Sequence, residues 1–167
     1  NLVIGTGSTL RYTGDGDSTN RLFTLDVSST TIASSGTGAI EFTNNGLMGL
    51  SGTGQRTLSL SGNNTGDNLM GVTIRNQSAT NFTSLAKNGS GTWILTGANT
   101  YTGNTNVNQG TLIIGNGGTT GSIASLNSIV GGGAVLGFDR SDTVTYAGII
   151  SGAGGVQQLG SGTSIFT

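Results

Sequence analysis

Few residues of this sequence could carry out chemistry, and two aspartates are the first candidates. Asp15 and Asp17 lie in the segment Gly14-Asp15-Gly16-Asp17, where carboxylates separated by glycine could converge on a calcium ion. A full calcium repeat needs several consecutive G-G-x-G-x-D units, and the sequence contains one partial copy. The pattern therefore favours an ordinary acidic loop, with calcium binding as the alternative.

Cleavage of sugar chains is the chemistry that paired carboxylates would support. Glycoside hydrolysis needs two carboxyl groups that face one bond and lie about 5 to 9.5 Å apart. The seven acidic residues are scattered, and Asp26 and Glu41 are the only pair expected on neighbouring turns of the chain. We therefore assign no catalytic residue and expect no enzyme activity. A polysaccharide-degrading enzyme that uses this pair is the alternative.

A second charged cluster contains Asp139, Arg140 and Asp142. These residues could bind a sugar or an ion. Opposite charges this close in sequence more commonly form a solvated turn with a local ion pair, which contributes little to stability. We therefore expect a charged turn here and assign no binding residue.

Three larger side chains are expected to have structural roles. Lys87 is the single lysine, and we expect its stem to pack on the protein while its ammonium group stays in water. Trp93 and Tyr101 could stack on a sugar ring, but aromatic residues in a motif more often fill a core or a corner. The sequence therefore predicts that both rings are buried.

The composition excludes several functional classes. The sequence has no cysteine and no histidine, so disulfides, thiolate metal sites and the commonest general base are absent. Charged residues make up 8% of the chain, against about 25% in an ordinary domain. The net charge of −1 leaves no basic surface that could hold phosphates. We therefore expect no cofactor, no metal ion and no nucleic-acid partner.

Short strands are the elements that must position these residues. Apolar residues occur in brief bursts that alternate with polar residues and end at glycine, asparagine or serine, which is typical of strands. The bursts cover residues 22–25, 39–42, 57–60, 93–95, 111–114 and 134–136. No stretch keeps a period of 3.6 residues, so we expect an all-β chain with essentially no helix.

A short strand with one apolar face cannot bury that face alone. If the chain coils so that each turn stacks on the previous one, the apolar faces close into a continuous narrow core. The bursts often begin 15 to 20 residues apart, for example at 39 and 57 or at 92 and 111. Roughly eight turns, each about 4.8 Å from the next, would form a rod on the order of 40 Å long. The sequence therefore predicts a solenoid with parallel hydrogen-bond ladders.

Internal copies support this prediction. Gly89–Thr96 returns as Gly160–Thr167, 71 positions later, and Thr57–Thr65 aligns with Thr92–Thr100 at an offset of 35. Similar segments at a fixed offset indicate a repeated structural unit.

Residues 85–115 contain a longer motif. Leu85 and Lys87 precede a Gly-Ser-Gly-Thr turn, an apolar strand, the segment Thr-Gly-Ala-Asn-Thr-Tyr-Thr-Gly, then Thr-Asn-Val and Gly-Thr-Leu. This pattern resembles the passenger-associated repeat of bacterial autotransporters, except that Trp93 stands where leucine is usual. Looser similarity extends over roughly two thirds of the chain.

The resemblance implies a right-handed parallel β-helix that is exported by the type V pathway. It implies a location at the surface of a Gram-negative bacterium, or outside it after release. Such repeats carry no catalytic residues and usually form stalks that hold an adhesin or effector region away from the outer membrane. We expect residues 1–167 to be one continuous β-helix segment, a piece of a longer passenger, with residues 85–115 as its best repeat.

The resemblance also implies partners. These are the rest of the same passenger chain and a C-terminal outer-membrane barrel, neither of which is part of this sequence, and the surface of a host or neighbouring cell. Self-association is a further possibility, because an open β-helix has unpaired strand edges at its ends and neither end of this chain has a charged, proline-containing cap. A self-assembling extracellular fibre is therefore the alternative structural function.

Overall fold

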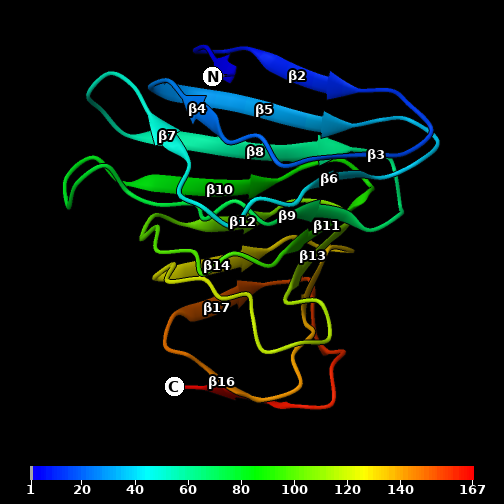
Figure 1. The fold of residues 1–167 in the computed structure, drawn as a ribbon. Helices are drawn as coiled ribbons and strands as arrows, with labels where there is room; N and C mark the ends of the chain where they lie inside the picture. The colour runs from blue at the N-terminus through cyan, green and yellow to red at the C-terminus, as the bar shows by residue number, and fades with distance from the viewer. Residues whose placement is uncertain (1) are drawn as a thin grey trace.

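The chain winds into a stack of flat coils, each made of short strands joined by corners (Figure 1). The computed structural model describes residues 2–167, and Asn1, the first residue of the predicted segment, lies outside the described residues. The colours of Figure 1 run in order from one end of the stack to the other, so neighbouring coils are also neighbours in sequence. Residues 2–167 contain no helix, which confirms the prediction of an all-β chain.

Two long sheets of seven parallel strands each form two faces of the stack. The first sheet contains β2 (Thr9–Tyr12), β5 (Ser28–Ser34), β8 (Arg56–Gly62), β10 (Thr83–Lys87), β12 (Thr105–Val107), β14 (Asn127–Val130) and β17 (Ile149–Gly152). The second sheet contains β3 (Asp17–Thr19), β6 (Ile40–Phe42), β9 (Asn68–Met70), β11 (Thr92–Leu95), β13 (Thr111–Ile114), β15 (Val135–Phe138) and β18 (Gly155–Gln158).

A third face closes each coil and is less regular. It begins with the three-stranded sheet of β1 (Leu2–Ile4), β4 (Phe23–Leu25) and β7 (Gly49–Leu50) and ends with the pair β16 (Thr143–Tyr146) and β19 (Thr163–Phe166). Between these two groups the described chain forms only isolated parallel bridges on this face, from Leu47 to Thr73 and from Ala98 to Ser122. The middle coils therefore have long corners here instead of strands.

The parallel pairing confirms the predicted β-solenoid, but the coils are longer and fewer than expected. Trp93 pairs with Leu112, 19 positions on, whereas Thr30 pairs with Leu58, 28 positions on. The long sheets have seven strands, against the roughly eight turns predicted. The predicted spacing of 15 to 20 residues holds for the shortest coils, such as the one from Thr92 to Thr111, but most coils are longer. The step from 39 to 57 instead joins bursts on different faces.

The internal copies are not stacked on one another. The offset of 35 aligns Trp93 with Leu58, yet Trp93 belongs to the second sheet and Leu58 to the first. The offset of 71 aligns Trp93 with Ser164 of β19, which lies on the third face. All faces need the same alternation of inward apolar and outward polar residues, so sequence similarity does not distinguish between them.

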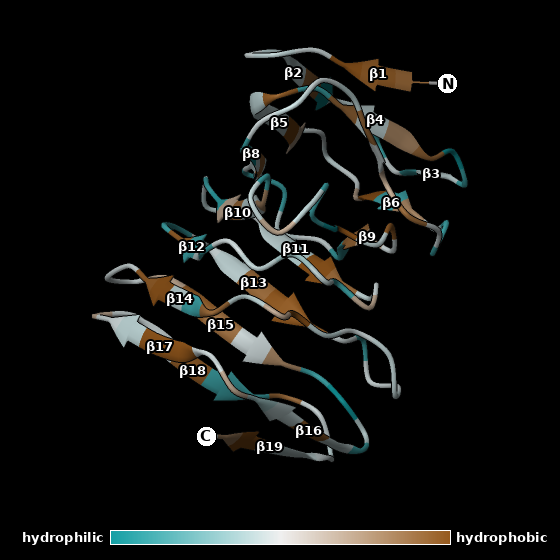
Figure 2. Ribbon diagram, turned by 90° about the vertical axis from the view of Figure 1, so that its left-hand side faces the viewer, coloured by the Kyte–Doolittle hydropathy of each residue, from teal (hydrophilic) through white to brown (hydrophobic). Residues whose placement is uncertain are grey.

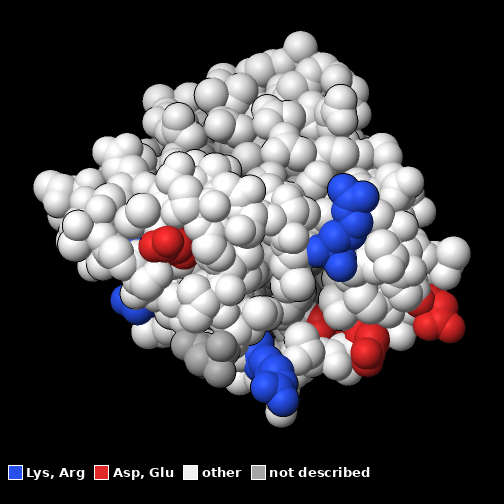
Figure 3. Space-filling model, turned by 90° about the horizontal axis from the view of Figure 1, so that it is seen from above, with Lys and Arg blue, Asp and Glu red and all other residues white. Residues whose placement is uncertain are grey.

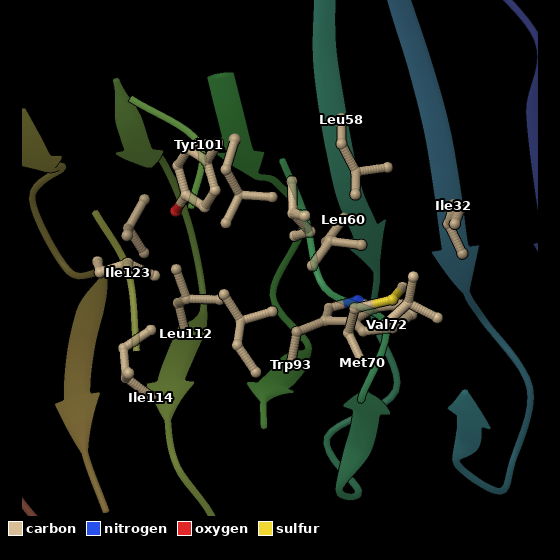
Figure 4. Packing of buried hydrophobic residues seen from close by; sticks show 14 of the residues in the cluster. Ile32, Leu58, Leu60, Met70, Val72, Trp93, Tyr101, Leu112, Ile114 and Ile123 are labelled. Carbon is tan, nitrogen blue, oxygen red and sulfur yellow. The ribbon is translucent and has the colours of Figure 1, made fainter. Parts of the chain in front are cut away.

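Inward side chains form continuous rows along the axis. Phe42, Met70, Leu95, Ile114 and Phe138 lie in register on successive coils of the second sheet, and all are buried. Figure 4 shows the middle of this core, where side chains from the two long sheets meet. In Figure 2 the hydrophobic residues lie mainly in the strands and the corners are paler. Each fully buried large apolar side chain contributes about 1.5 to 3 kcal/mol, so the rows supply much of the stability.

The surface carries few charges. Figure 3 shows one end of the stack, where a few positive and negative groups lie on a surface that is otherwise uncharged. In the part of the chain that the structure describes, no helix has the length and apolar character needed to span a membrane.

Candidate functional site

Lys87, at the end of β10, points into the core. It occupies the inward row of the first sheet between Leu60 on the preceding coil and Val107 on the next. Its relative exposure is 0%. The prediction that its ammonium group stays in water is therefore wrong. The alternation of Leu85, Ala86 and Lys87 places Lys87 on the same side as Leu85, and this signal could have identified the buried position.

Backbone carbonyl groups replace water around the ammonium group. Nζ of Lys87 donates hydrogen bonds to the carbonyl oxygens of Asn88 at 3.1 Å, Gly89 at 2.8 Å and Gln109 at 3.0 Å. The first two belong to the corner after β10, and Gln109 belongs to the equivalent corner of the next coil. Burial lowers the pKa of Lys87 to about 8, because it penalises the charged form. The side chain therefore acts as a clamp between two coils.

Gly110 leaves the space that the clamp needs. Its φ of +65° lies in the left-handed region that favours glycine. A Cβ atom at this position would lie 2.8 Å from Nζ of Lys87 and would overlap the carbonyl oxygen of Gly91. The Gly-Thr-Leu segment of the motif therefore begins with glycine for a steric reason.

Asn99, the asparagine of the Thr-Gly-Ala-Asn segment, connects three coils. It is 2% exposed. Its Oδ1 accepts a hydrogen bond from the backbone N–H of Ile74 at 2.8 Å. Its Nδ2 donates to the carbonyl oxygens of Gly97 and Ser122, both at 3.0 Å. Sequence reasoning missed this role, although an asparagine in a corner is a common means of satisfying backbone groups.

Trp93 and Tyr101 are buried, as predicted, and each has a hydrogen-bond partner. Nε1 of Trp93 donates to the carbonyl oxygen of Ser61 at 2.9 Å. The hydroxyl of Tyr101 lies 2.7 Å from Oγ1 of Thr105. Burial raises the pKa of the Tyr101 phenol above its usual value. Because both rings are enclosed, neither offers a surface on which a sugar could stack.

Arg56 is a buried cation that the sequence analysis did not single out. It begins β8, is 2% exposed and donates from Nη2 to the carbonyl oxygen of Ser51 at 3.1 Å and to Oε1 of Gln77 at 3.4 Å. Burial lowers its pKa, and the nearby charge of Asp26 opposes that effect. The alternation Arg56-Thr57-Leu58 places it on the inward side of the strand, which was the available signal.

Asp26 and Glu41 lie on one coil rather than on neighbouring coils, which corrects the expectation. Asp26 follows β4 at a corner of the third face, whereas Glu41 is exposed in the middle of β6 on the second sheet. The structure therefore places the two carboxylates on different faces of the coil, with β5 between them in sequence.

Asp26 instead ties three coils together. Its carboxylate accepts hydrogen bonds from the backbone N–H of Val27 at 2.9 Å, Oγ of Ser51 at 3.1 Å and Oγ1 of Thr6 at 3.3 Å. These donors hold the pKa of Asp26 below its usual value, with the Val27 N–H making the largest contribution.

Asp15 and Asp17 lie in and after the exposed corner between β2 and β3. Oδ1 of Asp17 accepts a hydrogen bond from the backbone N–H of Ser18 at 2.8 Å. Among residues 2–167 no group of three or more His, Cys, Asp or Glu side chains is placed to hold a metal ion. Within the described residues, no third carboxylate therefore joins these two aspartates.

In the charged cluster of Asp139, Arg140 and Asp142, the structure contains the local ion pair that was expected. Nε and Nη2 of Arg140 donate to the two carboxylate oxygens of Asp142 at 2.8 and 2.7 Å. These hydrogen bonds lower the pKa of Asp142. One further hydrogen bond of Arg140 was not predicted. Its Nη1 donates to the carbonyl oxygen of Gly121 at 2.6 Å and so attaches the ion pair to the corner of the preceding coil.

Comparison with known proteins adds to this geometry. Residues 85–114, which contain Lys87 and Asn99, match the model of the passenger-associated-transport-repeat. Over 155 residues, or 92% of its length, the chain is 56% identical to a protein of Brucella suis biovar 1 (strain 1330) named adhesin BmaC autotransporter. The chain spans 4% of the length of that relative. No solved structure matches the chain.

Lys87, Asn99 and the two aromatic residues described above lie within the matched segment. Lys87 clamps two coils, Gly110 admits its ammonium group, Asn99 joins three coils and the two aromatic rings fill the core. The chain is therefore a β-helical segment of the autotransporter passenger type, with a passenger-associated-transport-repeat at residues 85–114.

Proposed function

We propose that residues 1–167 are one continuous β-helix segment within a longer passenger, and that this segment takes part in adhesion without catalysing a reaction. The observation that carries the proposal is the clamp architecture. Lys87, Asn99 and Asp26 each join successive coils through buried or corner hydrogen bonds. A rod built in this way holds its shape over its length, as a stalk must. The relative named as an adhesin supports the adhesive role.

The proposed location is the surface of a Gram-negative bacterium or the medium around it. The proposed partners are the rest of the passenger chain, a C-terminal outer-membrane barrel and the surface of a host or neighbouring cell. Intact cells that produce the full passenger with an epitope inserted at the exposed residue Thr53 test the location. We expect antibody labelling and loss of the epitope on protease treatment without lysis. Labelling only after lysis would contradict the proposed location.

A replacement experiment separates the stalk role from direct binding. The passenger is produced with these residues deleted, or exchanged for an unrelated β-helix of the same number of coils, and adhesion to cultured cells is counted. Adhesion that falls on deletion and returns on exchange indicates a spacer, whereas adhesion that stays lost indicates that this segment itself binds. Unchanged adhesion after deletion, with normal surface display, would refute the proposal.

The end-to-end fibre remains the alternative. Sedimentation of the purified chain at rising concentration distinguishes it, because a fibre subunit grows into large species and a stalk segment stays at a fixed mass.

A further inference from the structure

A hollow of about 470 Å³ lies on the corner between the second sheet and the third face. This volume falls within the range of about 300 to 1,000 Å³ that is typical of small-molecule sites. We name it the corner groove, and its polar lining consists chiefly of Asn45, Thr96, Thr119, Thr120, Ser122 and Arg140.

Corners of unequal length create the groove. Ala98 and Ser122 are bridge partners on the third face of successive coils. Ala98 lies three residues after Leu95, the end of β11, whereas Ser122 lies eight residues after Ile114, the end of β13. The second corner is therefore five residues longer, and its residues 115–121 form a loop that stands out beyond the shorter corner of the preceding coil. The connection from β13 to β14 swings outward in Figure 1 for this reason. Residues of both corners line the hollow.

The loop is held in place from the next coil. The backbone N–H of Gly117 donates to the carbonyl oxygen of Asp139, and the N–H of Ser141 donates to that of Gly118, both at 2.9 Å. Arg140 binds the carbonyl oxygen of Gly121 and is itself fixed by the bidentate contact with Asp142. A wall that is fixed before a ligand arrives reduces the entropic cost of binding.

The lining offers uncharged hydrogen-bonding groups. The hydroxyls of Thr96, Thr119, Thr120 and Ser122 make no hydrogen bond to another residue within the described chain. Each hydroxyl can donate one hydrogen bond and accept others. The only charged lining residue is Arg140, whose charge is balanced by the carboxylate of Asp142 at 2.7 Å. The groove is therefore suited to a ligand that has many hydroxyl groups and no net charge.

We propose that the corner groove binds a neutral oligosaccharide of two or three sugar units. This inference rests on the proposed adhesive function and deepens it, because it names the class of molecule on the contacted cell. Sugar hydroxyls match the threonine and serine hydroxyls as donors and acceptors, and a site built to hydrogen-bond hydroxyl groups discriminates against ligands that lack them. The lining contains no aromatic ring, so we expect millimolar rather than micromolar affinity for one site.

The test is a titration of the 15N-labelled chain of 167 residues, followed by NMR. The probes are lactose, maltotriose and the trimer of N-acetylglucosamine, with sialyllactose and a short serine-rich peptide as comparators. We expect saturable shifts in the amides of residues 96–98 and 119–122 with at least one neutral sugar. Shifts caused only by sialyllactose would identify an anion contact at Arg140, and shifts caused only by the peptide would identify a peptide groove; either result would overturn the proposal.

Matched variants locate the binding. Thr119→Val with Thr120→Val removes two exposed hydroxyls at nearly constant volume, and we expect at least about tenfold weaker binding. Ala98→Trp, at an exposed lining position, should block the groove and abolish binding. Thr53→Val, in another exposed glycine-flanked corner, should bind like the wild type. The thermal transition of each variant is measured first, and sugar binding that survives Ala98→Trp in a folded chain refutes the groove as the site.

The outcome remains separable from the proposed function. If no neutral sugar binds at 20 mM, roughly an upper limit for a useful single site, the groove inference fails. The deletion experiment still decides independently whether the segment supports adhesion. If the groove binds a sugar but deletion of the segment does not change adhesion, the binding site is confirmed and the adhesive role is refuted.

Discussion

The ammonium group of Lys87 reaches from one coil to the next and donates a hydrogen bond to the backbone carbonyl of Gln109 at 3.0 Å. The same nitrogen also binds two carbonyl groups of its own corner. A single side chain therefore satisfies three backbone acceptors that would otherwise lie unpaired near the core.

Truncation of this side chain should destabilise the fold. Lys87→Ala removes the methylene stem and leaves three carbonyl groups without their donor, so we expect a loss of about 2 to 4 kcal/mol in the free energy of unfolding. Lys87→Met keeps most of the buried volume and removes the desolvated charge, so its loss should be smaller. Urea denaturation followed by circular dichroism measures both. A change below about 0.5 kcal/mol in Lys87→Ala would contradict the clamp.

Lys87 should also give stability a specific pH dependence. Its pKa is about 8 in the folded chain, against 10.5 for a free lysine, so between these values the unfolded chain binds more protons. Stability therefore rises with pH in this window, by about 1 to 2 kcal/mol between pH 8 and 9.5. The measurement stops at pH 9.5 because the raised pKa of Tyr101 has the opposite effect once unfolded tyrosine ionises. Lys87→Met is the control and should lack this rise; an equal rise in the variant would assign the effect to other groups.

Asn99 should be as important as a large core residue despite its polarity. Asn99→Ala removes three hydrogen bonds and leaves the buried backbone N–H of Ile74 without its acceptor, while the carbonyl groups of Gly97 and Ser122 keep one backbone hydrogen bond each. We expect a loss of about 2 to 4 kcal/mol in the free energy of unfolding. Asn104→Ala, at an exposed position with one long contact of 3.4 Å to Asn127, is the matched control and should change stability by less than about 0.5 kcal/mol. Similar losses in the two variants would rule out a special role for Asn99.

Two glycines with nearly equal backbone conformations separate steric from conformational effects. Gly110 has a φ of +65° and is crowded by Gly91 and Lys87, whereas Gly117 has a φ of +73° and open space around it. Gly117→Ala should cost about 1 kcal/mol, because alanine is disfavoured in this region. Gly110→Ala should cost clearly more, since its Cβ displaces the ammonium group. Thermal unfolding of both variants provides the comparison, and equal costs would show that the crowding is relieved without loss.

The ion pair at Arg140 should control the loop over residues 115–121 rather than global stability. Arg140→Lys loses the bidentate contact with Asp142 and the bond to Gly121, and lysine cannot replace a planar fork. We expect faster amide exchange in the loop and an almost unchanged thermal transition, because partly exposed ion pairs contribute little. Hydrogen exchange followed by mass spectrometry measures this. Loop exchange equal to that of the wild type would show that the backbone contacts alone hold the loop.

The alternation of residue types was sufficient to predict strands and parallel coils, and the position of Trp93 and Tyr101 within a motif indicated that both rings are buried. The alternation over Leu85, Ala86 and Lys87 also indicated that Lys87 points inward. We overlooked this signal because we judged the lysine by its residue type and not by its position relative to Leu85. Coil length was predicted poorly for a different reason. The corner after Leu95 and the corner after Ile114 differ by five residues, and no sequence pattern fixes a corner's length when glycine, asparagine and threonine are all compatible with bends.

At the candidate sites, contacts between residues close in sequence were predicted, and contacts between coils were not. The ion pair between Arg140 and Asp142 was predicted, because both partners lie within three residues of each other. The bond from Arg140 to Gly121 and the groove beside it depend on contacts between coils, which sequence separation conceals. Asp26 and Glu41 were placed on neighbouring turns because the assumed coil was too short.

The amide of Asn99 has a mechanical consequence. In a simple stack each layer contacts only its neighbours, and tension along the axis would peel layers away singly. Here one side chain holds the layer of Ile74, its own layer and the layer of Ser122, so these three must part together. The stack therefore contains a block that resists loss of one layer at a time, and Asp26, bonded to Thr6 and Ser51, forms a second such block closer to the N-terminus.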